Sequence, residues 1–117
     1  MSGRLTTHVL DTAHGRPAAG MRLQLWRREA GAPALLVAVA ETNADGRPDA
    51  PLLSGASMTR GTYELVFFVG SYYARVSPGS KAFLDEVPVR FTMDAPEEHY
   101  HVPLLVAPGG YSTYRGS

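Results

Sequence analysis

The chain ends in a cluster of residues that could do chemistry. Tyr114-Arg115-Gly116-Ser117 places an aromatic ring, a guanidinium, a hydroxyl and a carboxylate together. Chain termini usually fray, so an end with this many binding groups predicts that the tail is held against another part of the protein. The carboxylate of Ser117 would repel an incoming negative charge, so we expect this serine to position a reactant rather than to bond to it covalently.

Two histidines precede this tail in His99-Tyr100-His101. On an extended strand both imidazoles would point to one face, about 7 Å apart. With a third ligand from His8, His14 or a carboxylate, the pair could bind zinc or copper. One imidazole could instead act as a general acid or base near neutral pH. A third possibility is that both only donate and accept hydrogen bonds on a surface, as most histidines do.

Arg47 is the arginine whose setting most suggests ligand binding. It lies in Asp45-Gly46-Arg47-Pro48-Asp49, a reversal in which the proline restricts Arg47 to extended conformations. A guanidinium fixed in this way can donate two parallel hydrogen bonds to a flat, oxygen-rich ligand. Pairing of Arg47 with Asp45 or Asp49 inside the turn is the alternative, and this segment taken alone favours it.

The remaining candidates lie near the N-terminus. His8 lies in the middle of a predicted strand, where a half-exposed histidine would be ordinary if it stood alone. Asp11 closes that strand and is predicted to be a turn residue. His14 follows in a turn that contains glycine and proline, and it is predicted to face solvent.

Composition narrows the classes of partner and cofactor. Cysteine is absent, which excludes disulfides, thiol nucleophiles and thiolate metal sites. Eleven basic and eleven acidic residues cancel, so no overall charge would attract nucleic acid or an anionic membrane. No apolar run approaches the roughly 20 residues of a membrane helix, and Met1–Arg4 is too short and polar for a signal peptide. We therefore expect a soluble, cytoplasmic protein.

Stretches of alternating polar and apolar residues, separated by turn residues, predict a sheet protein. The predicted strands are Leu5–Asp11, Met21–Arg28, Leu35–Glu41, Tyr63–Val69, Val87–Met93, Tyr100–Val106 and Tyr111–Tyr114. One or two turns of helix are predicted over Ser71–Ser77. This pattern favours an all-β antiparallel sandwich in one domain over residues 1–117, with a small closed barrel as the alternative. Leu65–Val69 and Leu104–Val106 are apolar on both faces, which predicts a homo-oligomer.

Five segments resemble the 5-hydroxyisourate hydrolases, which are transthyretin-related enzymes of purine catabolism. The segments are Leu5–Asp11, Gly15–Ala18, Gly46-Arg47, His99–Leu105 and Tyr111–Ser117. Together they run from one end of the chain to the other. The terminal Tyr-Arg-Gly-Ser is the most specific of them, because it marks the hydrolases and is absent from transthyretin, the hormone carrier of the same fold.

The resemblance implies a prealbumin-like (transthyretin-like) sandwich of two four-stranded antiparallel sheets with one short helix. It also implies a homotetramer, a dimer of dimers, with active sites at the ends of a channel between the dimers. The implied reaction is hydrolysis of 5-hydroxyisourate to 2-oxo-4-hydroxy-4-carboxy-5-ureidoimidazoline in urate degradation, with no metal or other cofactor. The alternative is a transthyretin-like carrier that binds a small aromatic ligand in the channel.

Site residues can be transferred from the same resemblance, position by position. The catalytic residues it implies are His8, Arg47, His101 and Ser117. The substrate-binding residues it implies are His8, Arg47, Tyr114, Arg115, Gly116 and Ser117. His99 matches a position that is commonly histidine in this family, but we do not assign it to catalysis.

Overall fold

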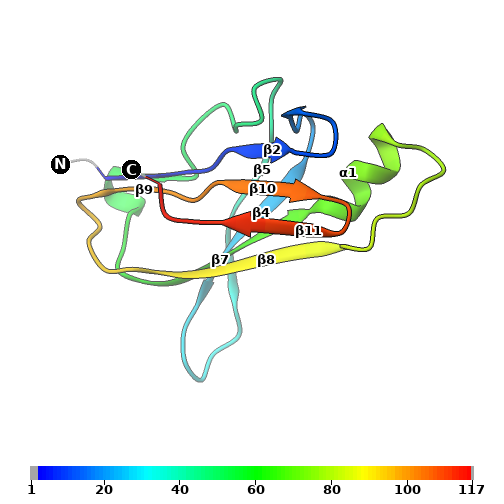
Figure 1. Cartoon of the computed structure of the whole chain (residues 1–117). Coiled ribbons are helices and arrows are strands. Elements are labelled where there is room, and N and C mark those ends of the chain that lie inside the picture. The colour runs from blue at the N-terminus through cyan, green and yellow to red at the C-terminus, as the bar shows by residue number, and fades with distance from the viewer. Residues whose placement is uncertain (1–2, 117) are drawn as a thin grey trace.

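A computed structural model of the chain describes residues 3–116 (Figure 1). The elements in chain order are β1 (Arg4–Thr6), β2 (Val9–Asp11), β3 (Arg16–Pro17), β4 (Arg22–Arg28), β5 (Leu35–Glu41), β6 (Leu53–Ser54), the 3-10 helix η1 (Gly55–Ser57), β7 (Gly61–Phe68), α1 (Val69–Val76), β8 (Glu86–Met93), β9 (His99–His101), β10 (Leu104–Ala107) and β11 (Gly110–Thr113). No helix within residues 3–116 has both the length and the apolar character needed to cross a membrane.

The strands form a sandwich, as predicted. One layer is the antiparallel sheet β5-β4-β7-β8. The other layer consists of the sheets β6-β1-β9 and β11-β10-β2-β3, which follow one another because β1 leads into β2 and β9 into β10. The prediction of antiparallel pairing throughout is wrong, since β1 pairs with β9, and β2 with β10, in parallel.

Two long predicted strands are each interrupted in the middle. Leu5–Asp11 breaks at residues 7–8, and Tyr100–Val106 breaks at residues 102–103. Pro103 has no N–H to donate to a ladder, which explains the second break. Backbone hydrogen bonds from Val102 N to Thr6 O and from Leu104 N to His8 O, both 2.9 Å, nevertheless connect the two segments across the break. The irregular stretch therefore remains tightly fixed.

Alternating side chains from both layers fill the core. In one layer Leu25 faces Leu65 across β4 and β7, and in the other Val9 faces Leu104 across β2 and β10. All four side chains are fully buried. Burial of a side chain of this size contributes about 1.5–3 kcal/mol each. All four side chains belong to one core cluster between the layers, so their packing holds the layers together. The Val9–Leu104 pair also helps to fix the register of the parallel strands β2 and β10.

Asp11 is the last residue of β2 and is buried, which corrects the prediction that it is a turn residue. Its carboxylate accepts hydrogen bonds from the hydroxyls of Tyr72 and Tyr73 on α1, at 2.7 and 2.8 Å. His14 is exposed, as predicted, but its Nδ1 also lies 2.7 Å from the same carboxylate. The helix lies over Val69–Val76 rather than Ser71–Ser77 because β7 continues into it directly.

Replacing Asp11 by alanine is expected to lower the free energy of unfolding, because it leaves the buried Tyr72 hydroxyl without its acceptor. An orphaned buried donor costs about 1–3 kcal/mol. Urea unfolding of the variant measures the loss. Glu29→Ala is the matched control, since this carboxylate is exposed and such surface changes usually stay within about 0.5 kcal/mol. Equal midpoints for the two variants would contradict the role given to Asp11.

Unfolding at acidic pH gives a second measure of how much the Asp11 carboxylate stabilises the fold. Burial alone would raise the pKa of Asp11, but hydrogen bonds from Tyr72, Tyr73 and His14 outweigh burial and lower it. Because the folded pKa lies below the unfolded value of 3.8, the stabilisation is fully present above pH 3.8 and disappears as the pH falls through the folded pKa. The difference in stability between wild type and Asp11→Ala should therefore shrink in acid.

Candidate functional site

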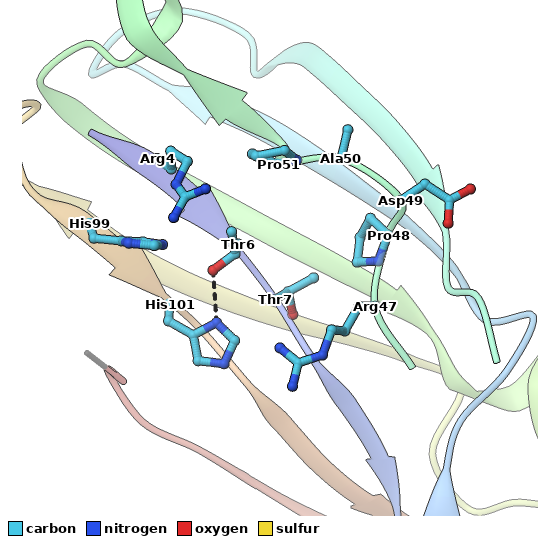
Figure 2. A pocket seen from close by; sticks show the side chains of 10 residues that line it. All are labelled: Arg4, Thr6, Thr7, Arg47, Pro48, Asp49, Ala50, Pro51, His99 and His101. Carbon is cyan, nitrogen blue, oxygen red and sulfur yellow. Dashed lines mark hydrogen bonds between the residues drawn. The ribbon is translucent and has the colours of Figure 1, made fainter. Parts of the chain in front are cut away.

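A cavity of about 370 Å³ lies beside the parallel strands β1 and β9 (Figure 2). Its lining residues come from these strands and from the loop after β5, and they are Arg4, Thr6, Thr7, Arg47, Pro48, Asp49, Ala50, Pro51, His99 and His101. Two predicted site residues, Arg47 and His101, thus meet in one cavity although they are distant in the sequence.

His101 is oriented by Thr6, a residue that no sequence pattern singles out. The parallel register of β1 and β9 places Thr6 opposite His101, and Thr6 Oγ1 lies 2.8 Å from His101 Nδ1. When Nδ1–H donates to this hydroxyl, Nε2 keeps its lone pair and can accept a proton. The sequence carries no signal for Thr6, because its importance depends on which strand pairs with β9.

The electrostatic surroundings of His101 favour its neutral form. Partial burial lowers the pKa of the imidazole, and the positive charges of Arg47, His8 and His99 lower it further. An imidazole with a pKa below the usual value of about 6.5 is unprotonated at neutral pH. His101 can therefore take a proton from a bound water molecule.

Arg47 is presented by a tight turn. Asn43 Oδ1 accepts hydrogen bonds from the N–H groups of Asp45 and Arg47, at 2.9 and 3.2 Å. Gly46 has φ of 79°, and a side chain there would meet the carbonyl oxygen of Val9, 2.4 Å from the added Cβ. The turn thus packs directly on Val9 at the start of β2, which fixes the position of the Arg47 backbone.

The predicted pairing of Arg47 with a turn aspartate is wrong for Asp49. The Asp49 carboxylate instead accepts a hydrogen bond from Asn43 Nδ2 at 3.0 Å. Figure 2 shows the Arg47 guanidinium directed toward the His101 ring, while the Asp49 carboxylate points away from both. The structure records no ion pair of Arg47 within residues 3–116. Its fork of donors is available to a ligand.

His8 lies next to this group but not on the cavity wall. Its Nε2 is 2.9 Å from the carbonyl oxygen of Asp45, and Val9 N donates to Gly46 O at 2.8 Å. His8 is half-buried. It therefore ties the Arg47 turn to the strand and contributes positive charge near His101 when protonated.

The C-terminal tail is held against another part of the protein, as predicted, and the part that it contacts is β9. Gly116 N donates a 2.7 Å hydrogen bond to the carbonyl oxygen of His101. The Arg115 guanidinium stacks 4.0 Å from the Tyr100 ring centroid and forms an ion pair of 3.0 Å with Glu98. Arg115 thus fastens the tail and does not line the cavity that holds Arg47.

The tail also forms one wall of a second cavity, of about 730 Å³. Its lining residues are Glu98, His99, His101, Tyr114, Arg115 and Gly116. Two histidines, His99 and His101, therefore lie between the two cavities, and a ligand could contact them from either side. Ser117 lies outside the described residues.

Metal binding by His99 and His101 needs a third ligand. Within residues 3–116 no three side chains of the histidine, aspartate and glutamate types converge in a way that could hold a metal ion. What the site offers is a neutral imidazole, a guanidinium with no ion pair to residues 3–116, and the hydroxyls of Thr6 and Thr7. This combination can hold a planar, oxygen-rich molecule and accept a proton from water.

Comparisons with known proteins agree on one family. A family model described as the HIUase/Transthyretin family matches residues 5–116. The 5-hydroxyisourate hydrolase of Halalkalibacterium halodurans is 57% identical over 119 residues, which cover 100% of this chain and 100% of that protein. The structure of Klebsiella pneumoniae 5-hydroxyisourate hydrolase is similar with a TM-score of 0.82 and 36% identity, covering 98% of this chain and 99% of that chain.

A second solved structure is similar over only part of its length. The crystal structure of (S)-allantoin synthase has a TM-score of 0.92 and 48% identity over 99% of this chain. This chain spans only 44% of that longer chain.

Proposed function

The chain belongs to the HIUase/Transthyretin family, and from this membership we propose that its site hydrolyses 5-hydroxyisourate in urate degradation. The product is 2-oxo-4-hydroxy-4-carboxy-5-ureidoimidazoline. One observation supports the proposal most directly: neutral His101 lines the same cavity as Arg47, which has no ion pair to the described residues 3–116, and Gly116 of the tail hydrogen-bonds the backbone of His101.

The reaction adds water to a ring carbonyl and breaks a C–N bond of the six-membered ring. We assign proton removal from the water to His101 or to His8, a contribution of roughly 10²–10⁴-fold for a general base. Arg47 binds the substrate oxygens and stabilises the negative charge that develops as the carbonyl becomes tetrahedral. The ring nitrogen leaves with the electron pair of the broken bond and takes up a proton, so that a carboxylate and an N–H remain.

The tail completes this proposal. The second cavity gives access to His101 from the tail side, and its wall there is formed by Tyr114, Arg115 and Gly116. The hydroxyl of Ser117 helps to orient the attacking water, as the resemblance of the tail implies. No residue of the tail forms a covalent bond with the substrate.

We further propose that the domain of residues 1–117 assembles as a cytoplasmic homotetramer, a dimer of dimers. β8 and β11 are edge strands of their sheets, and a cavity of about 500 Å³ lies between them. Val66, Phe68 and Leu105 leave apolar side chains partly exposed on the outer faces of their strands. Packing against further copies would cover these surfaces and close the site, in which Arg47 is exposed on the single chain.

The direct test generates 5-hydroxyisourate with urate oxidase and follows its ultraviolet absorbance with and without the protein. We expect the protein to accelerate the decay strongly. Decay at the uncatalysed rate, together with retention of the compound by the protein, would support a carrier that binds a small aromatic ligand in the channel.

Replacing Gly116 by alanine is expected to lower kcat/KM by roughly tenfold to a hundredfold, because small misplacements of a catalytic group have effects of this order. An added Cβ would lie 2.8 Å from His101 Cδ2 and 3.3 Å from its Cβ, so the ring or the tail must shift. The decay assay measures the change. Gly109→Ala is the matched control, since an added Cβ there meets nothing within 4 Å, and equal rates for both variants would contradict the close packing of tail and ring.

A further inference from the structure

A second group of reactive side chains lies far from the cavity that holds His101. α1 lies at the end of the sandwich opposite to both termini (Figure 1), and Ser77 directly follows it. Ser77 Oγ is 3.2 Å from His14 Nε2, and His14 Nδ1 is 2.7 Å from Asp11 Oδ2. The Ser77 hydroxyl thus contacts the His14 imidazole, which contacts the Asp11 carboxylate. This is the arrangement that activates nucleophilic serines in hydrolases.

The carboxylate of this group is held ionised. Asp11 accepts hydrogen bonds from Tyr72, Tyr73 and His14, and together they lower its pKa although burial opposes them. Burial and the bond to Asp11 raise the pKa of Tyr72 to about 12, so this hydroxyl remains a donor. An ionised carboxylate beside Nδ1 requires a proton on Nδ1. This tautomer leaves Nε2, which faces the Ser77 hydroxyl, as the nitrogen that can accept a proton.

The three residues are also held in place. The His14 ring stacks on the Tyr73 ring with centroids 6.2 Å apart. The backbone of Ser77 is fixed at the end of α1, where its N–H donates to Tyr73 O at 2.9 Å and its carbonyl accepts from Ser80 N at 3.1 Å. The Ser77 side chain is half-exposed, so a small molecule in solvent can reach it.

We propose that Ser77, activated by His14 and Asp11, is a second reactive site that accepts acyl groups from small activated esters. Ser77 Oγ bonds to the ester carbonyl carbon while its proton passes to His14 Nε2. The tetrahedral intermediate collapses, and the aryloxide or alkoxide leaves with the electron pair of the broken C–O bond and takes up a proton. Water then cleaves the acyl-serine ester to release a carboxylic acid and regenerate the hydroxyl.

The acyl-serine should accumulate. In serine hydrolases the N–H of the nucleophile itself often stabilises the oxyanion, and loss of one such donor costs about 10²–10³-fold in rate. The Ser77 N–H is already engaged with Tyr73 O, so it cannot serve in this way. The missing donor slows acylation and deacylation alike, but an aryloxide leaves an activated ester far more readily than the serine alkoxide leaves the acyl-serine. We therefore expect a stoichiometric burst followed by slow turnover.

The test treats the full-length protein with p-nitrophenyl acetate, follows nitrophenolate release and maps acetylated residues by peptide mass spectrometry. We expect acetylation of Ser77 to be at least about tenfold faster than that of Ser80 in the same molecules, because a general base contributes roughly 10²–10⁴-fold. Ser80 is a matched internal control, since its Oγ donates a hydrogen bond to the Ser77 carbonyl and, among residues 3–116, forms none with a histidine.

Variants separate activation from mere exposure. His14→Asn should slow acetylation of Ser77 at least about tenfold, which is the lower part of the range for a lost general base. Ser77→Ala should abolish the burst, and both variants should hydrolyse 5-hydroxyisourate at the wild-type rate, which also reports that they are folded. Acetylation confined to Lys81 or the N-terminal amine, Ser77 no faster than Ser80, or a His14→Asn rate equal to wild type would each overturn the proposal.

Discussion

Replacement of His101 by asparagine is expected to lower kcat for 5-hydroxyisourate by roughly 10²–10⁴-fold, the range that a general base contributes. Asparagine is close to histidine in size and can still hydrogen-bond Thr6, but it cannot take a proton from water. Burial and the neighbouring positive charges lower the pKa of His101, which increases the share of the ring that is in its basic form at neutral pH. The decay assay at saturating substrate measures the loss.

His8→Asn is the matched control, because the two histidines are the competing general bases. His8 bonds the Asp45 carbonyl rather than facing the cavity, so we expect its loss to disturb the Arg47 turn and to lower kcat less. The pH–rate profile separates the roles: wild type and His8→Asn should keep an acid limb with a midpoint below the usual value of about 6.5. Should the limb vanish only in His8→Asn, the roles are exchanged. A loss below about tenfold in both variants would refute the assignment.

Sequence periodicity predicts the antiparallel layer well and the other layer less well. The predicted strand Leu35–Glu41 coincides with β5, and Met21–Arg28 differs from β4 by one residue. These strands are long and alternate throughout, so their period is readable. β3 and β6 consist of two residues each and have no period to read. Parallel pairing of β1 with β9 depends on contacts between distant segments, which no local pattern contains.

In the site, too, features that depend on contacts between distant segments are not predictable from local sequence. The segments around Arg47 and His101 leave several roles open, and only the resemblance to the hydrolases singles these two residues out; the structure places both on one cavity. Thr6 is not predictable, because only the β1–β9 register makes it a partner of His101. Asp11 is misread as a turn residue for a similar reason: the tyrosines that bury it belong to a helix far along the chain.

Replacement of Arg47 by glutamine is expected to lower kcat/KM by about 10²–10³-fold, the usual effect of removing a donor that stabilises an oxyanion. It should also change the pH dependence. The Arg47 charge is one of the causes that lower the pKa of His101, so its removal raises that pKa and moves the acid limb of the profile to higher pH. Measurement of kcat/KM across the acidic range reports both effects.

Two further variants decide what the guanidinium contributes. Arg47→Lys keeps the charge but not the planar fork, so the acid limb should stay near its wild-type position while most of the rate loss remains. Arg28→Gln is the control, since this arginine pairs with Glu64 on the opposite layer and should leave rate and profile unchanged. If Arg47→Gln slows the reaction without moving the acid limb, the guanidinium does not act on His101 in the working enzyme. Arg47 and His101 would then act on the substrate independently although they share a cavity. The proposal that the Arg47 charge tunes proton removal by His101 would have to be abandoned.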